Sequence, residues 1–170
     1  WASGQAQEKP NIIFLMTDDQ GWGDVGYNGH PHIKTPHLDD MAAKAMRFDR
    51  FYAGASVCSP TRAGAVTGRN NWRMNMNSPA NPSEAHVPRE ELTIAEALKP
   101  VGYRTGHFGK WHIGGFDKEN SGIHFRPPWE TGFDVTFSTR NVISTMDPYR
   151  KPHKYGDVAM YWDNGRVIPH

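Results

Sequence analysis

Short apolar runs alternate with polar and glycine-rich stretches along the 170-residue chain. The first run, residues 11–17 (NIIFLMT), is uninterrupted and predicts a strand buried on both faces, as in a parallel sheet covered by helices. Residues 46–55 (MRFDRFYAGA) alternate enough to predict another strand, with Phe48 and Tyr52 as its buried bulk. Residues 103–115 (YRTGHFGKWHIGG) predict a second central strand that runs into a glycine-rich loop.

Three helices are predicted between and after these strands. Thr35 can cap a helix that has a proline in its first turn and apolar residues along one face. A second helix is expected to begin beside Cys58, because Pro60 fits a first helical turn. Residues 92–102 (LTIAEALKPVG) predict a third helix, which Thr93 caps and a proline and a glycine end.

The pattern weakens in the last third of the chain. A strand is predicted near Val135, and residues 158–170 (VAMYWDNGRVIPH) predict a hairpin with its turn at Asn164-Gly165. Strands that alternate with helices indicate an α/β fold. Because few core strands are visible, residues 9–170 are expected to be the N-terminal portion of a larger domain.

Composition and charge narrow the possible classes. Residues 1–8 lack apolar periodicity and predict a disordered leader or the remnant of a secretory signal peptide. The net charge is +1, so no large basic field indicates nucleic-acid binding. No apolar run is long enough to predict a transmembrane helix. A single cysteine cannot form an internal disulfide, so cysteine usage does not indicate the compartment.

That cysteine, Cys58, lies in the segment ASVCSPTRAGAVTGR. At a helix N-terminus the unpaired N–H groups favour an anion, and Arg62 lies one turn further on. This placement favours a reactive cysteine. The alternative is a small buried thiol, and local chemistry alone leaves the two equal.

Two further polar groupings are candidate metal sites. Asp18 and Asp19 follow the first apolar run, and two adjacent carboxylates repel each other unless a cation or hydrogen-bond donors are present. The histidines of residues 30–37 (HPHIKTPH) could suggest zinc, but three histidines from one proline-containing loop rarely form such a site.

Three motifs together resemble the sulfatase family. The segment Cys58-Ser59-Pro60-Thr61-Arg62 is similar to its Cys-x-Pro-x-Arg motif. Residues 9–26 (KPNIIFLMTDDQGWGDVG) resemble its opening strand with metal-binding aspartates, and residues 102–115 resemble its second motif. The implied fold is an alkaline-phosphatase-like sheet flanked by helices. Ala65 and Phe108 depart from the usual residue sizes, which we interpret as changes in packing.

The resemblance implies a role for the lone cysteine. In that family a formylglycine-generating or sulfatase-maturating enzyme oxidises the motif cysteine, here Cys58, to Cα-formylglycine. The aldehyde hydrates to a geminal diol, and one hydroxyl attacks sulfur and expels the alcohol. The second hydroxyl then loses its proton, the carbonyl reforms and sulfate leaves. A serine lacks that second hydroxyl and would remain sulfated, so the cysteine is kept as the precursor of a nucleophile.

The resemblance also implies the remaining site. Asp18, Asp19 and the modified Cys58 would bind one Ca²⁺. Arg62 would hold the diol, and Lys110 would bind the sulfate oxygens as a point charge. His112 would act on the diol proton, facing the same way as Lys110 along an extended segment.

The expected activity is hydrolysis of a sulfated carbohydrate or aryl sulfate ester, in the periplasm, outside the cell or in a lysosome. The stretch PPWETGFDVTFST resembles glycan sulfatases of the N-acetylgalactosamine-6-sulfatase type. Candidate sugar contacts, which could equally pack loops, are Trp72, Arg73, His86, Trp129 and Arg140.

Two alternative functions remain open. One is a phosphonate monoester hydrolase or phosphodiesterase with the same nucleophile. The other is a catalytically incomplete fragment, because the family's second histidine, second lysine and Asp-Asn pair would fall beyond His170. Asp163-Asn164-Gly165 resembles that pair, but it is interpreted as a hairpin turn.

Overall fold

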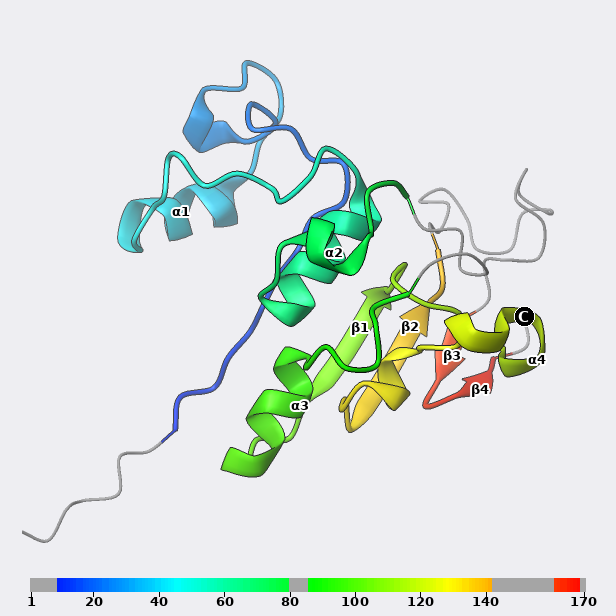
Figure 1. The fold of residues 1–170 in the computed structure, drawn as a ribbon. Coiled ribbons are helices and arrows are strands. Elements are labelled where there is room, and N and C mark those ends of the chain that lie inside the picture. Colours follow the sequence, from blue (N-terminus) through cyan, green and yellow to red (C-terminus); the bar gives the residue numbers. More distant parts are fainter. Residues whose placement is uncertain (1–8, 80–85, 142–160, 169–170) are drawn as a thin grey trace, which may run out of the picture. The chain divides into compact units, whose positions relative to one another are not determined.

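The computed structural model describes residues 9–79, 86–141 and 161–168 (Figure 1). The chain divides into two units, Trp1–Asp49 and Arg50–His170. The leader predicted for residues 1–8 lies outside the described residues. None of the helices in the described ranges is long and apolar enough to cross a membrane.

The first unit contains the helical turn η1 (Gly26–Asn28) and the helix α1 (Pro36–Lys44). The predicted helix is confirmed, but the predicted side-chain cap is wrong. The Thr35 hydroxyl accepts the Gly26 N–H at 2.8 Å and donates to Asp39 Oδ1 at 2.8 Å. The hydroxyl therefore ties η1 to α1 and caps no helix N–H.

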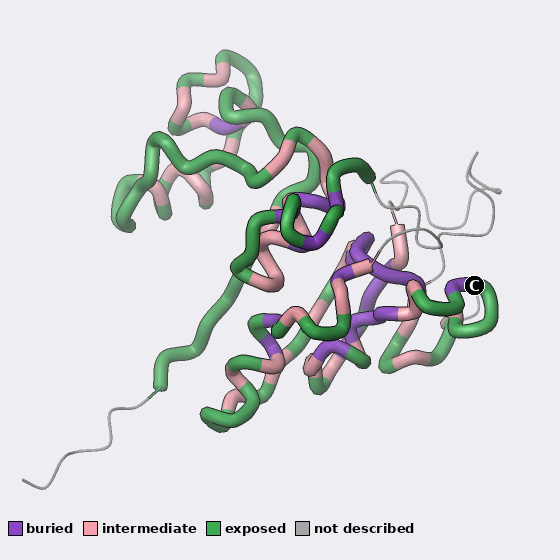
Figure 2. The backbone as a smooth tube through the Cα atoms, viewed as in Figure 1, coloured by how far each residue is buried: buried purple, intermediate pink, exposed green. Residues whose placement is uncertain are grey.

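Neither N-terminal strand prediction is confirmed. Residues 11–17 have no regular secondary structure, and Ile13 and Leu15 are 84% and 80% exposed. Residues 46–55 are also irregular, so the predicted burial of Phe48 and Tyr52 is wrong, and both are exposed (Figure 2). A strand buried on both faces needs paired neighbours and covering helices, and the described part of the first unit contains no strand.

The second unit contains the two other predicted helices. Helix α2 (Cys58–Thr67) ends at Gly68, whose left-handed φ of 67° suits a glycine C-cap. Helix α3 (Ile94–Leu98) follows Thr93 as predicted. The shorter helical segments of this unit are η2 (Asn71–Met74), η3 (Lys99–Val101), α4 (Lys118–Ser121), η4 (Gly122–His124) and η5 (Pro128–Glu130).

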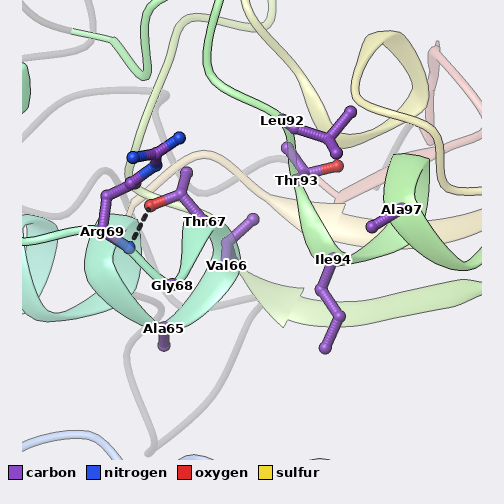
Figure 3. A pocket seen from close by; sticks show the side chains of 9 residues that line it. All are labelled: Ala65, Val66, Thr67, Gly68, Arg69, Leu92, Thr93, Ile94 and Ala97. Atoms are coloured by element: carbon purple, nitrogen blue, oxygen red, sulfur yellow. Dashed lines mark hydrogen bonds between the residues drawn. The ribbon is translucent and has the colours of Figure 1, made fainter.

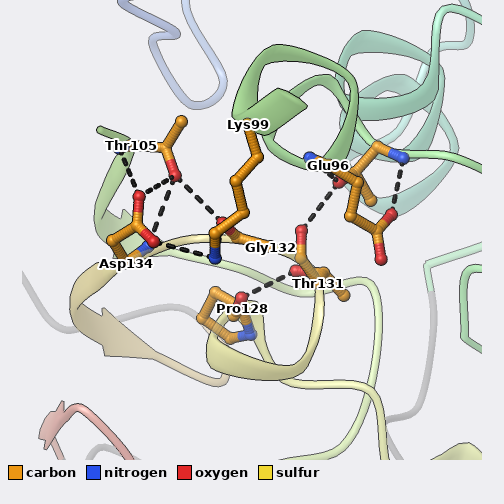
Figure 4. Close-up of polar contacts among 8 residues, drawn as sticks. Glu96, Lys99, Thr105, Pro128, Thr131, Gly132 and Asp134 are labelled. Atoms are coloured by element: carbon orange, nitrogen blue, oxygen red, sulfur yellow. Dashed lines mark hydrogen bonds and ion pairs between the residues drawn. The ribbon is translucent and has the colours of Figure 1, made fainter. Parts of the chain in front are cut away.

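Polar contacts attach α3 to the rest of the second unit (Figure 4). The Thr93 hydroxyl accepts the Glu96 N–H, and the Glu96 carboxylate accepts the Thr93 N–H, which makes a complete capping box. The same hydroxyl donates to the Thr131 carbonyl at 2.7 Å. Lys99 forms an ion pair with Asp134 at 2.8 Å, so both ends of the helical segment are attached to residues 131–134.

Four strands form one mixed sheet in the order β1-β2-β3-β4. β1 (Gly106–Lys110) and β2 (Val135–Thr139) are parallel, whereas β3 (Tyr161–Asp163) and β4 (Arg166–Val167) continue the sheet antiparallel. The predicted strands near residues 106 and 135 and the predicted hairpin are therefore confirmed, but β1 lies at the edge of the described sheet and not at its centre as predicted. Together with the helices, the sheet confirms the α/β class.

The hydrophobic core lies in the second unit. Trp111 and Ile113, which follow β1, are members of it and are only 1% and 0% exposed. The full set of buried core residues is Ala63, Met74, Met76, Val87, Trp111, Ile113 and Phe116. The segment after β1 is thus held on all sides by packing.

Candidate active site

Cys58 is the first residue of α2, and Val57 before it is extended. Ser59 and Pro60 directly after it are buried, so the start of the helix is fixed in the core. Cys58 itself is half-buried. The predicted position at a helix N-terminus is confirmed, and the thiol is accessible in part, unlike an inert core cysteine.

His112 contacts this cysteine. Its Nδ1 lies 3.2 Å from Cys58 Sγ, although the two residues are 54 positions apart in sequence. His112 is only 8% exposed. A thiol can donate to a neutral imidazole, and an imidazolium can donate to a thiolate, so a proton can move between these two atoms.

The chain turns between β1 and His112. The Trp111 N–H donates to Thr139 O, and the His112 N–H donates to Arg140 O, both at 2.9 Å. His112 has a left-handed φ of 58°, so the predicted extended path from Lys110 to His112 is wrong. Two ladder-like hydrogen bonds hold the strained residue, and this turn is what directs its ring toward α2.

Arg62 links the two motifs. Its Nη1 donates to the Lys110 carbonyl at 2.7 Å, which joins the second turn of α2 to the end of β1. The Lys110 residue is half-buried at the same strand end. Cys58 and His112 are thus in contact, and Arg62 reaches the main chain of Lys110, so these four residues come together within the second unit.

β1 also carries a half-buried histidine, His107, that sequence reasoning did not single out. His107 Nδ1 lies 2.7 Å from Ser138 Oγ, and its ring meets Trp111 edge-on at 5.0 Å. Burial, with a smaller contribution from the Arg62 charge, lowers the pKa of His107 to about 4. The strand alternation that places His107 on the inner face was the available signal.

Asp18 and Asp19 lie in the first unit, exposed at the end of the apolar run. Their carboxylate oxygens have the right chemistry for a hard cation, but together they supply at most four of the six to eight oxygens that Ca²⁺ takes. Within the described residues, no group of three or more His, Cys, Asp or Glu side chains could hold a metal. The cation site stays a prediction.

Two alternative metal motifs have structural roles. His30 Nδ1 accepts the N–H groups of His32 and Ile33, at 3.1 and 2.7 Å, which shapes its loop. Asn164 and Gly165 have φ values of 46° and 84° and form the predicted hairpin turn. The Asn164 Oδ1 accepts the Thr136 N–H at 2.8 Å, so this amide is used to attach the turn to β2.

The candidate sugar contacts separate into three groups. Trp129 stacks on Trp162 at 5.6 Å, and His86 pairs with His124, so these two pack against protein. Trp72 is exposed on the surface, and Arg73 beside it is exposed as well. Arg140 is half-buried, and burial lowers its pKa. Trp72 and Arg73 thus remain available to a ligand.

A hollow of about 330 Å³ lies between the end of α2 and the start of α3 (Figure 3). Its lining begins at Ala65, about 10 Å along α2 from Cys58, and includes none of the candidate site residues. The residues that line it are Ala65, Val66, Thr67, Gly68, Arg69, Leu92, Thr93, Ile94 and Ala97.

Comparison with known sequences gives consistent matches. A family model described as Sulfatase matches residues 10–165. The chain is 46% identical over 116 residues to human arylsulfatase A, which covers 66% of this chain and 23% of that protein. It is 40% identical over 158 residues to mouse N-acetylgalactosamine-6-sulfatase, covering 87% and 29% of the two proteins. The chain spans less than a third of the length of these relatives.

Solved structures match over nearly the whole chain. Ps i-CgsB superposes with a TM-score of 0.80 at 27% identity, covering 95% of this chain and 37% of that chain. The same protein has been solved with k-i-k-neocarrahexaose. A sulfatase from a Bacteroides thetaiotaomicron locus for glycosaminoglycan metabolism superposes with a TM-score of 0.76 at 31% identity, covering 94% and 32%.

Proposed function

Because the chain belongs to the sulfatase family, we propose that it forms the nucleophile-bearing part of a sulfuric ester hydrolase. One observation carries the proposal: Cys58 Sγ and His112 Nδ1, from two separate family-like motifs, lie 3.2 Å apart. A nucleophile precursor within hydrogen-bond reach of a general acid–base is the arrangement that covalent hydrolysis requires.

Cys58 is proposed to become active by oxidation to formylglycine, carried out by a formylglycine-generating or sulfatase-maturating enzyme. The hydrated aldehyde supplies one hydroxyl to attack sulfur and a second to release sulfate. His112 then holds or moves a proton at residue 58 through Nδ1, which lies 3.2 Å from Cys58 Sγ in the unmodified chain.

Two positively charged side chains and a divalent cation complete the proposed site. Arg62 is oriented by its bond to the Lys110 carbonyl, so its positive charge stays beside the helix start and stabilises negative charge there. Lys110 would bind sulfate oxygens. Asp18 and Asp19 are the proposed ligands of a divalent cation, Ca²⁺, which would polarise the sulfate ester when bound.

The substrate is proposed to be a sulfated carbohydrate, with aryl sulfates as surrogate substrates. Two matched proteins support this class by name: N-acetylgalactosamine-6-sulfatase, and Ps i-CgsB in complex with k-i-k-neocarrahexaose. Exposed Trp72 could stack on a sugar ring, and Arg73 beside it could pair with a substrate anion. A periplasmic, secreted or lysosomal location is proposed to match such a substrate.

Parallel assays on an aryl sulfate and an aryl phosphate ester test this function. The protein that carries this chain is co-expressed with a formylglycine-generating enzyme, beside Cys58→Ala and the exposed control Lys44→Ala. We expect sulfate ester hydrolysis in the wild type and in Lys44→Ala, and none in Cys58→Ala. Activity retained by Cys58→Ala would refute the proposal, and faster hydrolysis of the phosphate ester would favour the phosphodiesterase alternative.

A further inference from the structure

Two histidines that are not part of the candidate active site face each other. His86 Nδ1 lies 3.0 Å from His124 Nδ1, and the ring centroids are 5.1 Å apart with the planes at 69°. The residues are 38 positions apart in sequence, and both are half-buried. The contact joins segment 86–89 to the loop of η4, and the proposed sulfatase chemistry does not use it.

The same two segments are fastened on both sides of the residues that follow His112. The buried Val87 donates its N–H to Ile113 O at 3.0 Å. Gly115 donates its N–H to His124 O at 2.8 Å. The histidine pair therefore closes a ring of contacts that runs from segment 86–89 through residues 113–115 to His124 and back.

A hydrogen bond between two imidazole Nδ1 atoms needs one N–H and one lone pair. The pair can form with both rings neutral or with one proton added. When both rings are protonated, two N–H groups and two positive charges face each other at 3.0 Å, so the contact changes from attractive to repulsive.

The surrounding charges oppose that double protonation. Burial, His124, Arg89 and Arg126 lower the pKa of His86, and only Glu90 acts in the opposite direction. Arg89 is held close because its Nη2 donates to the Phe125 carbonyl at 2.9 Å. Near neutral pH His86 is therefore neutral and able to take part in the contact.

We propose that His86 and His124 form a pH-sensitive latch that fastens segment 86–89 beside the active-site turn and releases when both rings are protonated. Release removes one side of the ring of contacts around Ile113, the residue after His112. Acidification thus loosens the backbone that positions His112, while helix α2 with Cys58 keeps its own hydrogen bonds. The latch depends only on these contacts and operates whether or not the chain hydrolyses sulfate esters.

Amide hydrogen exchange tests the latch directly. The reporter is the Val87 amide, which donates to Ile113, and the reference is the Gly68 amide, which donates to Gly64 in the same unit. Each rate is divided by the intrinsic rate at its pH. We measure the protection of Val87 relative to Gly68 between about pH 7.5 and pH 5.5. Below the pH at which the opened histidine pair takes up its second proton, we expect this protection to fall by about tenfold for each pH unit, because one proton is bound when the pair opens.

A matched double variant separates the latch from general acid sensitivity. His86→Gln with His124→Gln keeps an amide–amide hydrogen bond but has no titrating ring. Its Val87 protection should not vary with pH relative to Gly68. Constant protection in the wild type, or an equal fall in the double variant, would overturn the proposal.

A second measurement covers the case in which the double variant does not fold. NMR titration of the wild-type imidazole nitrogens should show coupled uptake, with the second proton bound more weakly than the first. Two independent titrations near the ordinary histidine pKa would overturn the latch.

Discussion

At the scale of single residues, His112 combines a nearly complete burial with a left-handed backbone and a ring nitrogen beside Cys58. A residue with a β-carbon loses free energy at φ near 58°, and asparagine tolerates this region better than most. The backbone and the ring can therefore be tested separately by substitution.

His112→Ala should lower the free energy of unfolding by about 1 kcal/mol more than His112→Asn, because only asparagine suits the left-handed backbone. Urea denaturation of the two variants measures this difference. Both variants remove the imidazole, so the alkylation rate of Cys58 should change to the same extent in each. Equal stabilities of the two variants would show that the backbone at residue 112 is not strained.

Candidate site residues could be named from the sequence, but their geometry could not be predicted. The local pattern placed Cys58 at a helix start with Arg62 one turn further on, and the family resemblance grouped these two residues with Lys110 and His112. The contact between Sγ and Nδ1 depends on a turn after β1 that local sequence does not encode. Backbone hydrogen bonds from β2 and Arg140, across the sheet, hold that turn.

At the scale of secondary-structure elements, the inner faces of β1 and β2 carry a polar pair in an apolar setting. His107 is bonded to the fully buried Ser138 and packs between Trp111 and Phe133. Since its pKa is lowered from 6.5 to about 4, the folded state binds fewer protons than the unfolded state between these values. His107 therefore costs no stability above pH 6.5 and destabilises the fold progressively as the pH falls toward 4.

His107→Asn should remove this pH dependence while keeping a side-chain hydrogen bond to Ser138. Between pH 6.5 and pH 4 the free energy of unfolding of the wild type should fall by up to about 3 kcal/mol relative to that of the variant. This follows from the lowering of the His107 pKa from 6.5 to about 4. Denaturation curves across this range measure the difference, with Ser138→Ala as the control that keeps the titrating ring. If the free energies of unfolding of the wild type and His107→Asn changed equally with pH, His107 would not be a half-buried histidine that is kept neutral by the fold.

Gly165 is predicted to stabilise the hairpin turn, because a residue with a β-carbon would be strained there. Its φ is 84°, and a β-carbon there would lie 3.3 Å from the Trp129 ring. Gly165→Ala should therefore lower the free energy of unfolding by about 1 kcal/mol or more. Thermal unfolding measures the effect beside Gly23→Ala, where a β-carbon meets nothing within 4 Å. A Gly165→Ala protein as stable as Gly23→Ala would mean that the turn has another conformation.

Elements with local signals were predicted well. Helix α3 has its capping box, α2 has a proline in the first turn and a glycine at the end, and the hairpin has Asn-Gly. The strand predicted at residues 11–17 had no such signal. An apolar run becomes a strand only when partners pair with its edges, and the described part of the first unit contains none.

At the scale of the whole molecule, large apolar side chains remain exposed. Besides Ile13 and Leu15, the aromatic residues Phe48, Phe51 and Tyr52 are open to solvent. Exposed apolar runs without charge are sites of self-association. The described chain therefore contains surface that favours contact with other protein.

The chain should self-associate with rising concentration, and Ile13→Lys with Leu15→Lys should reduce this. Size-exclusion chromatography with light scattering measures the mass of the species. Gln20→Lys with Asn77→Lys adds the same two positive charges at exposed polar positions and serves as the control. A monodisperse wild type at all concentrations, or an equal effect of the control variant, would refute the role of the apolar run.

We propose that Cys58 is the precursor of the nucleophile of a sulfatase. This is tested by mass analysis of the peptide that contains residue 58, after co-expression with a formylglycine-generating enzyme. We expect a peptide lighter by the difference between cysteine and formylglycine, and no conversion in a Cys58→Ser control. A peptide that retains the mass of unmodified cysteine, while a known sulfatase matured in the same cells is converted, would contradict it.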